Sequence, residues 1–270
     1  VGGAVPDGRR AGQSRDAHSC VGLAMSIRIG TAGWTIPANV ADEFPAAGSA
    51  LERYASLFAT VEINSSFHRS HRPVTWARWA ASVPDGFRFA AKLAKIITHQ
   101  KKLVDCEQEI RAFGEEVAGL GDKLGVVLVQ LPPKLAFDAD IAEKFFDQLR
   151  AVLPAAIACE PRNASWFAPE VDAFLAQRAV ARVAADPALS DEAARPGGWL
   201  RLAYWRLHGS PVMYRSSYAG RMDAIARAIA GSAVAERWCL FDNTASSAAT
   251  GDALALQRLL GELSRGSLAR

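Results

Sequence analysis

The chain has 270 residues, of which 50% are apolar, so it can bury the core of one large α/β domain or of two small ones. A net charge of +3 is too small to predict, by itself, binding to nucleic acid or to a membrane surface. No stretch approaches the ~20 apolar residues of a membrane span, and the four cysteines are scattered without a C-x-x-C pair, which is typical of reduced thiols in a cytoplasmic protein.

The first 24 residues are rich in Gly, Arg, Ser and Asp and contain no long apolar block, so they do not resemble a secretory signal. Met25 then opens the segment MSIRIGTAGW, which reads like a natural start. We expect residues 1–24 to form a disordered extension and residues 25–270 to form one folded domain.

Eight β-rich runs follow in chain order, and helical patterns separate most of them. The runs cover residues 27–30, 60–64, 87–92, 125–130, 156–160, 181–186, 202–208 and 237–242. Several are apolar throughout, as expected for a parallel sheet that is buried on both faces. Helical periodicity covers residues 50–59, 110–120, 141–153, 169–178, 222–230 and 252–263. The connection between the sixth and seventh runs is a poor helix former and is predicted to be irregular.

Strand–helix alternation on this scale predicts an α/β fold, namely a single-domain (β/α)8 TIM-like barrel. An open, doubly wound sheet is the main alternative. No G-x-G-x-x-G motif follows the first predicted strand, which weakens a nucleotide-binding version of that alternative.

Polar side chains stand at or just after the carboxyl end of nearly every predicted strand, where barrels of this type build their active sites. Any one of them could simply cap a helix or close a turn. As a set they predict one polar pocket, formed by Glu62, Asn64, Lys92, His99, Gln130, Glu160, Arg162, Trp166, Asp186, Arg206, His208, Tyr218 and Asn243. Two pairs, Glu62 with Asn64 and Arg206 with His208, are two residues apart, so each pair shares one face of its strand.

At these positions the chain resembles the YecE-like family, also called domain of unknown function 72 (DUF72). The resemblance rests on GTAGW (30–34), YASLFATVEINSSFHR (54–69), FRFAAKLAKIITH (87–99), LGVVLVQLPP (124–133), CEPRNASWF (159–167), WRLHG (205–209) and FDNT (241–244). These motifs span almost the whole chain beyond the extension. The resemblance implies a TIM-barrel-like fold but no particular reaction. Asp242 departs from the pattern, because relatives usually carry Asn there.

The favoured functional hypothesis is an enzyme that acts on a small anionic or polyhydroxylated substrate by general acid/base chemistry. Glu62, Glu160 or Asp186 would act as general acid or base, with His208 and His99 as proton shuttles. Lys92, Arg162 and Arg206 would supply positive charge, and the remaining members of the set would bind substrate. The alternative is that Glu160–Arg162 and Asp186–Arg206 are structural ion pairs.

Three further hypotheses stay open. A divalent metal could bind Glu160, Asp186, His208 and Asp242, although two arginines would crowd the cation; no other cofactor is implied. Nucleic acid is an unfavoured partner. If it bound, its bases would stack on the aromatic side chains of Trp34, Phe67, Trp166 and Tyr218. Lys92 could form a Schiff base, although carboxylates such as Glu62 would tend to keep it charged.

Overall fold

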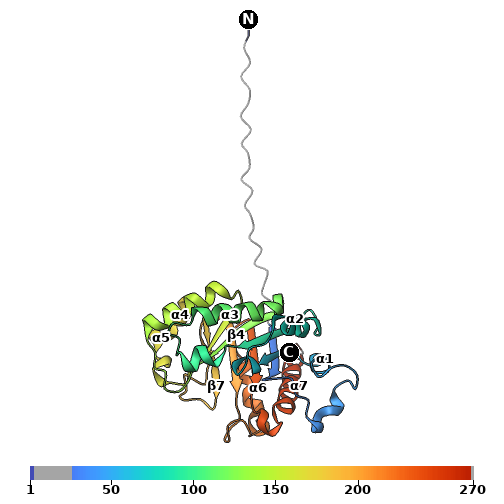
Figure 1. Ribbon diagram of the computed structural model, residues 1–270. Helices are drawn as coiled ribbons and strands as arrows, with labels where there is room; N and C mark the ends of the chain where they lie inside the picture. Colours follow the sequence, from blue (N-terminus) through green and yellow to red (C-terminus); the bar gives the residue numbers. More distant parts are fainter. Residues whose placement is uncertain (3–25, 269–270) are drawn as a thin grey trace.

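The computed structural model describes residues 1–2 and 26–268. The predicted extension, residues 1–24, therefore lies outside the described residues except for its first two. The rest forms an α/β structure in which parallel strands are surrounded by helices (Figure 1). No described helix has both the length and the apolar character needed to cross a membrane.

The strands are β1 (Ser26–Thr31), β2 (Thr60–Ile63), β3 (Arg88–Lys92), β4 (Leu124–Gln130), β5 (Ala156–Glu160), β6 (Val180–Arg182), β7 (Ala184–Asp186), β8 (Gly197–Gly198), β9 (Leu202–Leu207) and β10 (Glu236–Phe241). All eight predicted strands are present. The sixth is divided into β6 and β7, which are separated only by Val183.

The strands close into a ring of parallel pairings. One sheet has the order β1-β10-β9-β7 and the other has the order β2-β3-β4-β5-β6-β8. A parallel bridge between Ala32 and Glu62 joins β1 to β2. On the opposite side, β6 pairs with β5 and β7 pairs with β9, so the β6–β7 run links the two sheets. The predicted single-domain TIM-like barrel is therefore confirmed.

The helices are α1 (Ala50–Ala55), α2 (Pro73–Ala81), α3 (Glu107–Val117), α4 (Ala139–Val152), α5 (Pro169–Gln177), α6 (Met222–Ala230) and α7 (Ala249–Leu268). Local signals start several of them. Ser49 and Glu52 form a capping box at α1, and the Asp138 side chain accepts a hydrogen bond from the Ile141 amide at the start of α4. Helix α2 was not among the predicted segments; it begins at a proline, and its Trp76 is fully buried.

The connection between β7 and β9 contains no helix, as predicted. It carries the two-residue strand β8, which pairs antiparallel with β6. At the end of β7, the Asp186 carboxylate contacts Tyr218 and Arg221 from the segment that follows β9.

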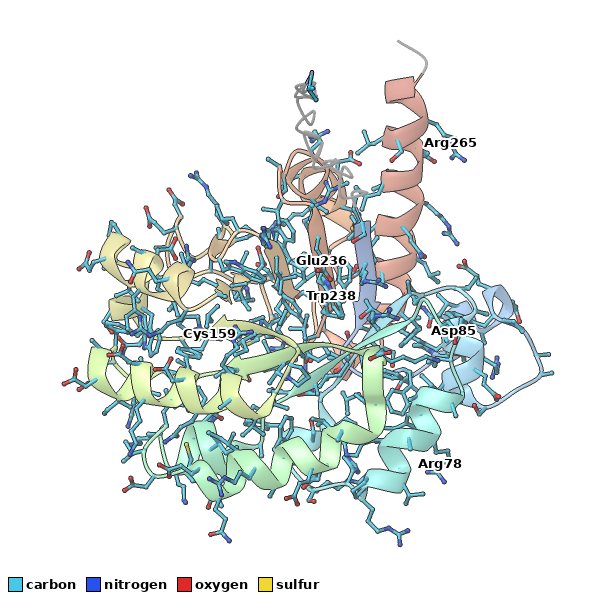
Figure 2. The ribbon with its side chains drawn as sticks, turned by 90° about the horizontal axis from the view of Figure 1, so that it is seen from above. Arg78, Asp85, Cys159, Glu236, Trp238 and Arg265 are labelled. Carbon is cyan, nitrogen blue, oxygen red and sulfur yellow. The ribbon has the colours of Figure 1, made fainter. Side chains whose placement is uncertain are left out.

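The barrel has two apolar cores, one inside the ring and one between the strands and the helices. The inner core consists of Ala90, Val126, Leu128, Ala158, Ala181, Val183, Leu202, Tyr204, Trp238 and Leu240. These residues follow a period of two along each strand, as lumen-facing positions must. Figure 2 shows Trp238 in the middle of the molecule, whereas Arg78 of α2 and Arg265 of α7 lie at its periphery.

Close approach of backbones inside the ring requires glycine at two positions. A Cβ added at Gly30 of β1 would overlap the backbone carbonyl of Thr60 in β2. A Cβ at Gly125 would stand 2.8 Å from the ring of Trp238. The two glycines therefore let the neighbouring strand and the largest lumen side chain reach their positions.

Candidate active site

The charged side chains at the barrel mouth occupy the next lumen-facing positions along the strands. Glu160 follows Ala158 on β5, and Lys92 follows Ala90 on β3, each two residues beyond a member of the inner core. Arg206 and then His208 follow Tyr204, and Asp242 follows Leu240 at the end of β10. Because side chains alternate along each strand, the lumen-facing positions are apolar in the inner core and charged one step further, at the mouth. These charged side chains form a layer above the inner core.

Arg206 lies at the centre of this layer and contacts three carboxylates. Its Nε and Nη2 donate to Glu62 at 2.8 and 2.5 Å, in a bidentate pair. Nη1 donates to Glu160 at 2.8 Å, and Nη2 also donates to Asp242 at 3.1 Å. The side chains of Arg206, Glu62 and Glu160 have no exposed surface. Because all three groups are removed from water, they must satisfy one another.

His208 is held between two carboxylates. Its Nδ1 lies 3.0 Å from Asp242 Oδ2, and its Nε2 lies 2.9 Å from Glu160 Oε1. Only the imidazolium can donate to both. Arg162 Nη2 lies 2.6 Å from the same Nε2 and 2.5 Å from the same Glu160 oxygen. A neutral ring would instead accept from Arg162 at Nε2, so hydrogen-bond partners are in place for both protonation states.

The charges of the layer set its titration. Burial alone would raise the pKa of Glu160, but Arg206, His208 and Arg162 outweigh burial and hold that pKa well below its usual value. The pKa of Asp242 is lowered against the effect of burial, mainly by Arg206 and His208. Burial opposes the charge of Arg206, yet the carboxylates raise its pKa. Glu62, Glu160 and Asp242 are thus matched by Lys92, Arg162 and Arg206, and a protonated His208 adds one positive charge.

Lys92 differs from the other cations of the layer. Its side chain is buried, with 6% of the residue exposed, and its Nζ lies over the ring of Phe67, 4.2 Å from the centroid. Within the described part of the chain, Nζ has no hydrogen-bond or ion-pair partner. Burial, together with the charge of Arg206, lowers the pKa of Lys92 to about 8 against the opposing effect of the carboxylates.

Four more groups line the rim above the charged layer. Gln130 Nε2 donates to Glu160 Oε1 at 3.3 Å. His99 packs edge-on against Phe67 at 4.9 Å, and its pKa is lowered by burial and by the neighbouring Lys92 and Lys95. The ring of Tyr214 stands edge-on to His208 at 5.8 Å, and Asn64 keeps a buried Oδ1 with no partner among the described residues.

A separate cavity of about 330 Å³ opens beside the mouth, between α3 and the segments that follow β2 and β3. Phe67 belongs both to this cavity, which it lines, and to the charged layer, where it covers Lys92. The cavity wall includes Arg69, Lys95, Glu109 and Glu116.

Asp186 was predicted to be catalytic, but the structure places it on the other face of its strand. In the register of β7 with β9, Ala185 is opposite Arg206 and Asp186 is opposite Leu207, which belongs to the outer core. Asp186 therefore points toward the helices, where Arg221 Nη2 lies 2.6 Å from its carboxylate. The alternative of an Asp186–Arg206 ion pair is wrong for the same reason.

Three residues predicted to bind substrate also lie outside the cluster. The Tyr218 hydroxyl donates to the Asp186 carboxylate at 2.9 Å and accepts from the Gly209 amide at 2.9 Å. Trp166 is 1% exposed, and its Nε1 donates to the Leu135 carbonyl at 2.9 Å. The Asn243 side chain donates to Asp252 of α7 at 2.7 Å. Each follows a strand in sequence, but its polar atom is bonded outside the charged layer: Trp166 to a loop, Tyr218 to the end of β7 and Asn243 to α7. Buried Trp166 and Tyr218 also cannot stack on bases.

Two members of the charged layer, Tyr204 and Asp242, have roles that were not predicted from the sequence. Tyr204 donates to Glu62 Oε2 at 3.2 Å and stacks over Trp238. The spacing of two between Tyr204, Arg206 and His208 was the signal that could have identified it. Asp242 had been considered only as a metal ligand, yet it bridges Arg206 and His208.

The predicted four-residue metal set is not assembled. Glu160, His208 and Asp242 meet, but Asp186 faces away from them. The oxygens of Glu160 and Asp242 accept hydrogen bonds from guanidinium groups. Across residues 26–268, no three His, Cys, Asp or Glu side chains are grouped so that they could hold an ion.

Comparison with known proteins places this arrangement in a family. The model of "Protein of unknown function DUF72" matches residues 28–269. The UPF0759 protein YecE of Escherichia coli K12 is 32% identical over 84 residues, which is 31% of either chain. The UPF0759 protein YunF of Bacillus subtilis 168 is 28% identical over 155 residues, 53% of either chain. The matched stretches thus cover about a third to a half of these curated relatives.

A solved structure agrees with the barrel described above. A DUF72 family protein from Enterococcus faecalis V583 superposes with a TM-score of 0.72 at 22% identity, covering 88% of this chain and 99% of that one. Because the family model matches nearly all of the described residues, the chain belongs to the DUF72 family, whose other members include YecE-like proteins.

Proposed function

We propose that the protein is an enzyme that acts on a small anionic or polyhydroxylated molecule by general acid/base chemistry at the carboxyl ends of its barrel strands. The observation that carries this proposal is the position of His208. Its two ring nitrogens lie 3.0 Å from Asp242 and 2.9 Å from Glu160, with Arg162 close enough to replace Glu160 as a partner. The imidazole ring can therefore lose or gain a proton and keep its orientation.

The charge layer also supports binding of a polar ligand. Lys92 and Arg162 are the cations nearest to solvent, since Arg206 is fully enclosed by carboxylates. An anionic group or a pair of hydroxyls placed above them would accept from the ammonium and the guanidinium. Gln130 and Asn64 would orient the rest of the molecule. Among the described residues, none holds the Lys92 ammonium in a hydrogen bond or an ion pair, which leaves it free to bind a ligand.

Neither alternative function gains a specific observation. The carboxylate oxygens that a divalent cation would need are already engaged by Arg206 and Arg162. Two of the four aromatic residues proposed to stack on bases are buried. A cytoplasmic location remains part of the proposal; it is supported by three buried cysteines, Cys106, Cys159 and Cys239, whose thiols are free.

The test is ligand-induced thermal stabilisation across sugar phosphates, polyols and organic acids. A ligand at about 100 times its Kd contributes about 2.7 kcal/mol, a rise of several degrees in Tm. We expect at least one compound class to stabilise the native chain and Glu143→Gln equally, because Glu143 belongs to a surface ion pair with Arg178. Glu160→Gln should lose the ligand-induced shift relative to its own unliganded Tm.

The contrary result is clear. No stabilising compound, together with a Glu160→Gln variant as stable as the native chain, would mean that the charged layer is neither a binding site nor a coupled network. Equal shifts in all three proteins would place the binding site away from Glu160.

A further inference from the structure

We propose that Lys92 forms a covalent imine with its ligand, which makes the substrate class a small aldehyde or ketone that carries hydroxyls or a carboxylate. This inference rests on the proposed function, because it assigns the reactive group and the ligand chemistry of the same site.

The first support is that the Lys92 amine lacks the partners that a structural lysine has. Lys123 is also largely enclosed, and its Nζ donates to the carbonyls of Ala80 and Val83 at 2.9 and 2.7 Å. Lys101 likewise has a carbonyl and a carboxylate partner, at 2.7 and 2.6 Å. Among the described residues nothing comparable reaches Lys92 Nζ, although 94% of the residue is buried (6% exposed). Because Nζ itself is not fully enclosed, an entering ligand can reach an amine that no described side chain holds.

The second support is that the neighbouring carboxylates are already occupied. Glu62 accepts from Arg206 and Tyr204, Glu160 accepts from Arg206 and Arg162, and Asp242 lies between Arg206 and His208. They act on Lys92 through space and do not hold its ammonium in an ion pair. Glu62 therefore stabilises the charged form of Lys92 less than its position in the sequence predicts, because its oxygens are bonded to Arg206 and Tyr204.

The balance of burial and charge agrees with this geometry. With a pKa lowered to about 8, a far larger share of the Lys92 side chains is neutral near pH 7.4 than for an ordinary lysine. Only the neutral amine has the lone pair that attacks a carbonyl carbon.

The chemistry balances without an oxidant or reductant. The amine nitrogen forms a C–N bond to the carbonyl carbon, and the oxygen takes a proton to give a carbinolamine. A proton taken up from solvent joins the hydroxyl as the C–O bond breaks, so water departs and the nitrogen, which keeps its last proton, is left as the protonated imine. The proton taken up replaces the one that Lys92 released on becoming neutral. A protonated imine retains the single positive charge of Lys92, so the match between three carboxylates and three cations is preserved in the adduct.

Reductive trapping tests the proposal with the full chain. The probes are glycolaldehyde, a neutral hydroxyaldehyde, and pyruvate, an anionic ketone, each with sodium cyanoborohydride at about pH 7.4 and short reaction times. Site-resolved peptide mass spectrometry then compares Lys92 with Lys95, which is exposed, only three residues away and thus an internal control. We expect Lys92 to be labelled at least about tenfold faster than Lys95 by one of the two probes.

Two matched variants complete the design. Lys92→Arg keeps the positive charge but should abolish the fast-labelled site, whereas Lys95→Arg should leave the labelling rate of Lys92 unchanged. If Lys92→Arg fails to fold, the comparison of Lys92 with Lys95 inside the native chain still decides the question.

Equal labelling of Lys92 and Lys95 by both probes overturns the imine. If, in that case, acids without an aldehyde or keto group still raise the Tm of the native chain, the binding site stands and Lys92 serves only as its charged anchor. If no compound raises the Tm either, the proposed function fails together with the imine.

Discussion

Replacing Arg206 with Met tests whether the charged layer of the barrel depends on its central cation. The substitution keeps an unbranched side chain in the lumen but removes every guanidinium contact. Glu62 loses two hydrogen bonds, at 2.8 and 2.5 Å, Glu160 loses one at 2.8 Å, and Asp242 loses one at 3.1 Å. Three carboxylates would then share the barrel mouth with one cation fewer.

The expected cost follows from burial. Removing one partner of a buried ion pair costs about 3–5 kcal/mol, because the remaining charge is left uncompensated. Glu62 and Glu160 have no exposed side-chain surface, so water cannot replace the guanidinium without opening the barrel. Against a total stability of roughly 5–15 kcal/mol, Arg206→Met should remove a large fraction of it.

The assay is urea unfolding followed by tryptophan fluorescence and circular dichroism, with Arg221→Met as the matched control. Arg221 also pairs with an aspartate, Asp186 at 2.6 Å, but its side chain is 51% exposed. A pair of that kind contributes about 0–1 kcal/mol. The two variants therefore delete the same chemical group from a buried network and from a surface pair.

The pH dependence supplies an independent readout. In the native chain the pKa values of Glu160 and Asp242 are held below their usual values, so their stabilisation is present above about pH 4.5 and is lost as the pH falls through the folded-state pKa. Without Arg206, burial raises both pKa values. The variant then takes up protons when it folds, so lowering the pH stabilises it. The difference in free energy of unfolding between the native chain and the variant should therefore become smaller as the pH falls from about 7.5 to about 5.

If Arg206→Met lowers the free energy of unfolding by less than about 1 kcal/mol, as the Arg221 control does, the charged layer does not depend on Arg206. A gap that stays constant or widens toward acid pH would likewise show that the carboxylates are not the groups left unpaired.

Three other predictions concern packing around the site. Gly30→Ala should destabilise the chain by about 1–3 kcal/mol in urea unfolding, since its Cβ would overlap a neighbouring backbone carbonyl; Gly86→Ala, where a Cβ has open space, should change stability by less than about 1 kcal/mol, and equal effects would contradict the close approach. Trp166→Phe should lower the Tm through loss of the hydrogen bond to a carbonyl, but leave ligand-induced shifts intact; a selective loss of binding would return Trp166 to the site. In a Cys20→Ser background, a chromogenic disulfide should react with no thiol of the folded chain near pH 8 and with three after denaturation, because burial raises the pKa of each remaining cysteine; rapid reaction in the folded chain would contradict this for Cys106, Cys159 and Cys239.

Part of the site could be predicted from the sequence because strand geometry is local. Arg206 and His208, two residues apart, were expected on one face, and the structure brings both to the same carboxylates. Lys92 and Glu160, at the ends of apolar strands, likewise reach the mouth. The fold followed from the same local signals, since eight buried parallel strands separated by helical segments close into a barrel.

Which face of a strand enters the lumen could not be read in the sixth predicted strand. In the run 181–186 (ARVAAD), alanine and valine occupy one set of alternate positions, and the other set holds Arg182, Ala184 and Asp186. Nothing local decides which set enters the lumen. The register of β7 on β9 decides it, and turns Asp186 toward Arg221.

The succession of strands along the chain, their burial and the residue types at their ends could be predicted from the sequence, because these depend on propensities and periods of a few residues. Which polar groups meet depends on the packing of segments that are far apart in the chain. Trp166, Tyr218 and Asn243 follow their strands by a few residues, yet each is drawn to a partner supplied by a distant part of the chain. That no residue in the described part of the chain pairs with Lys92 is decided in the same way, because Arg206 and Arg162 already hold the carboxylates around it.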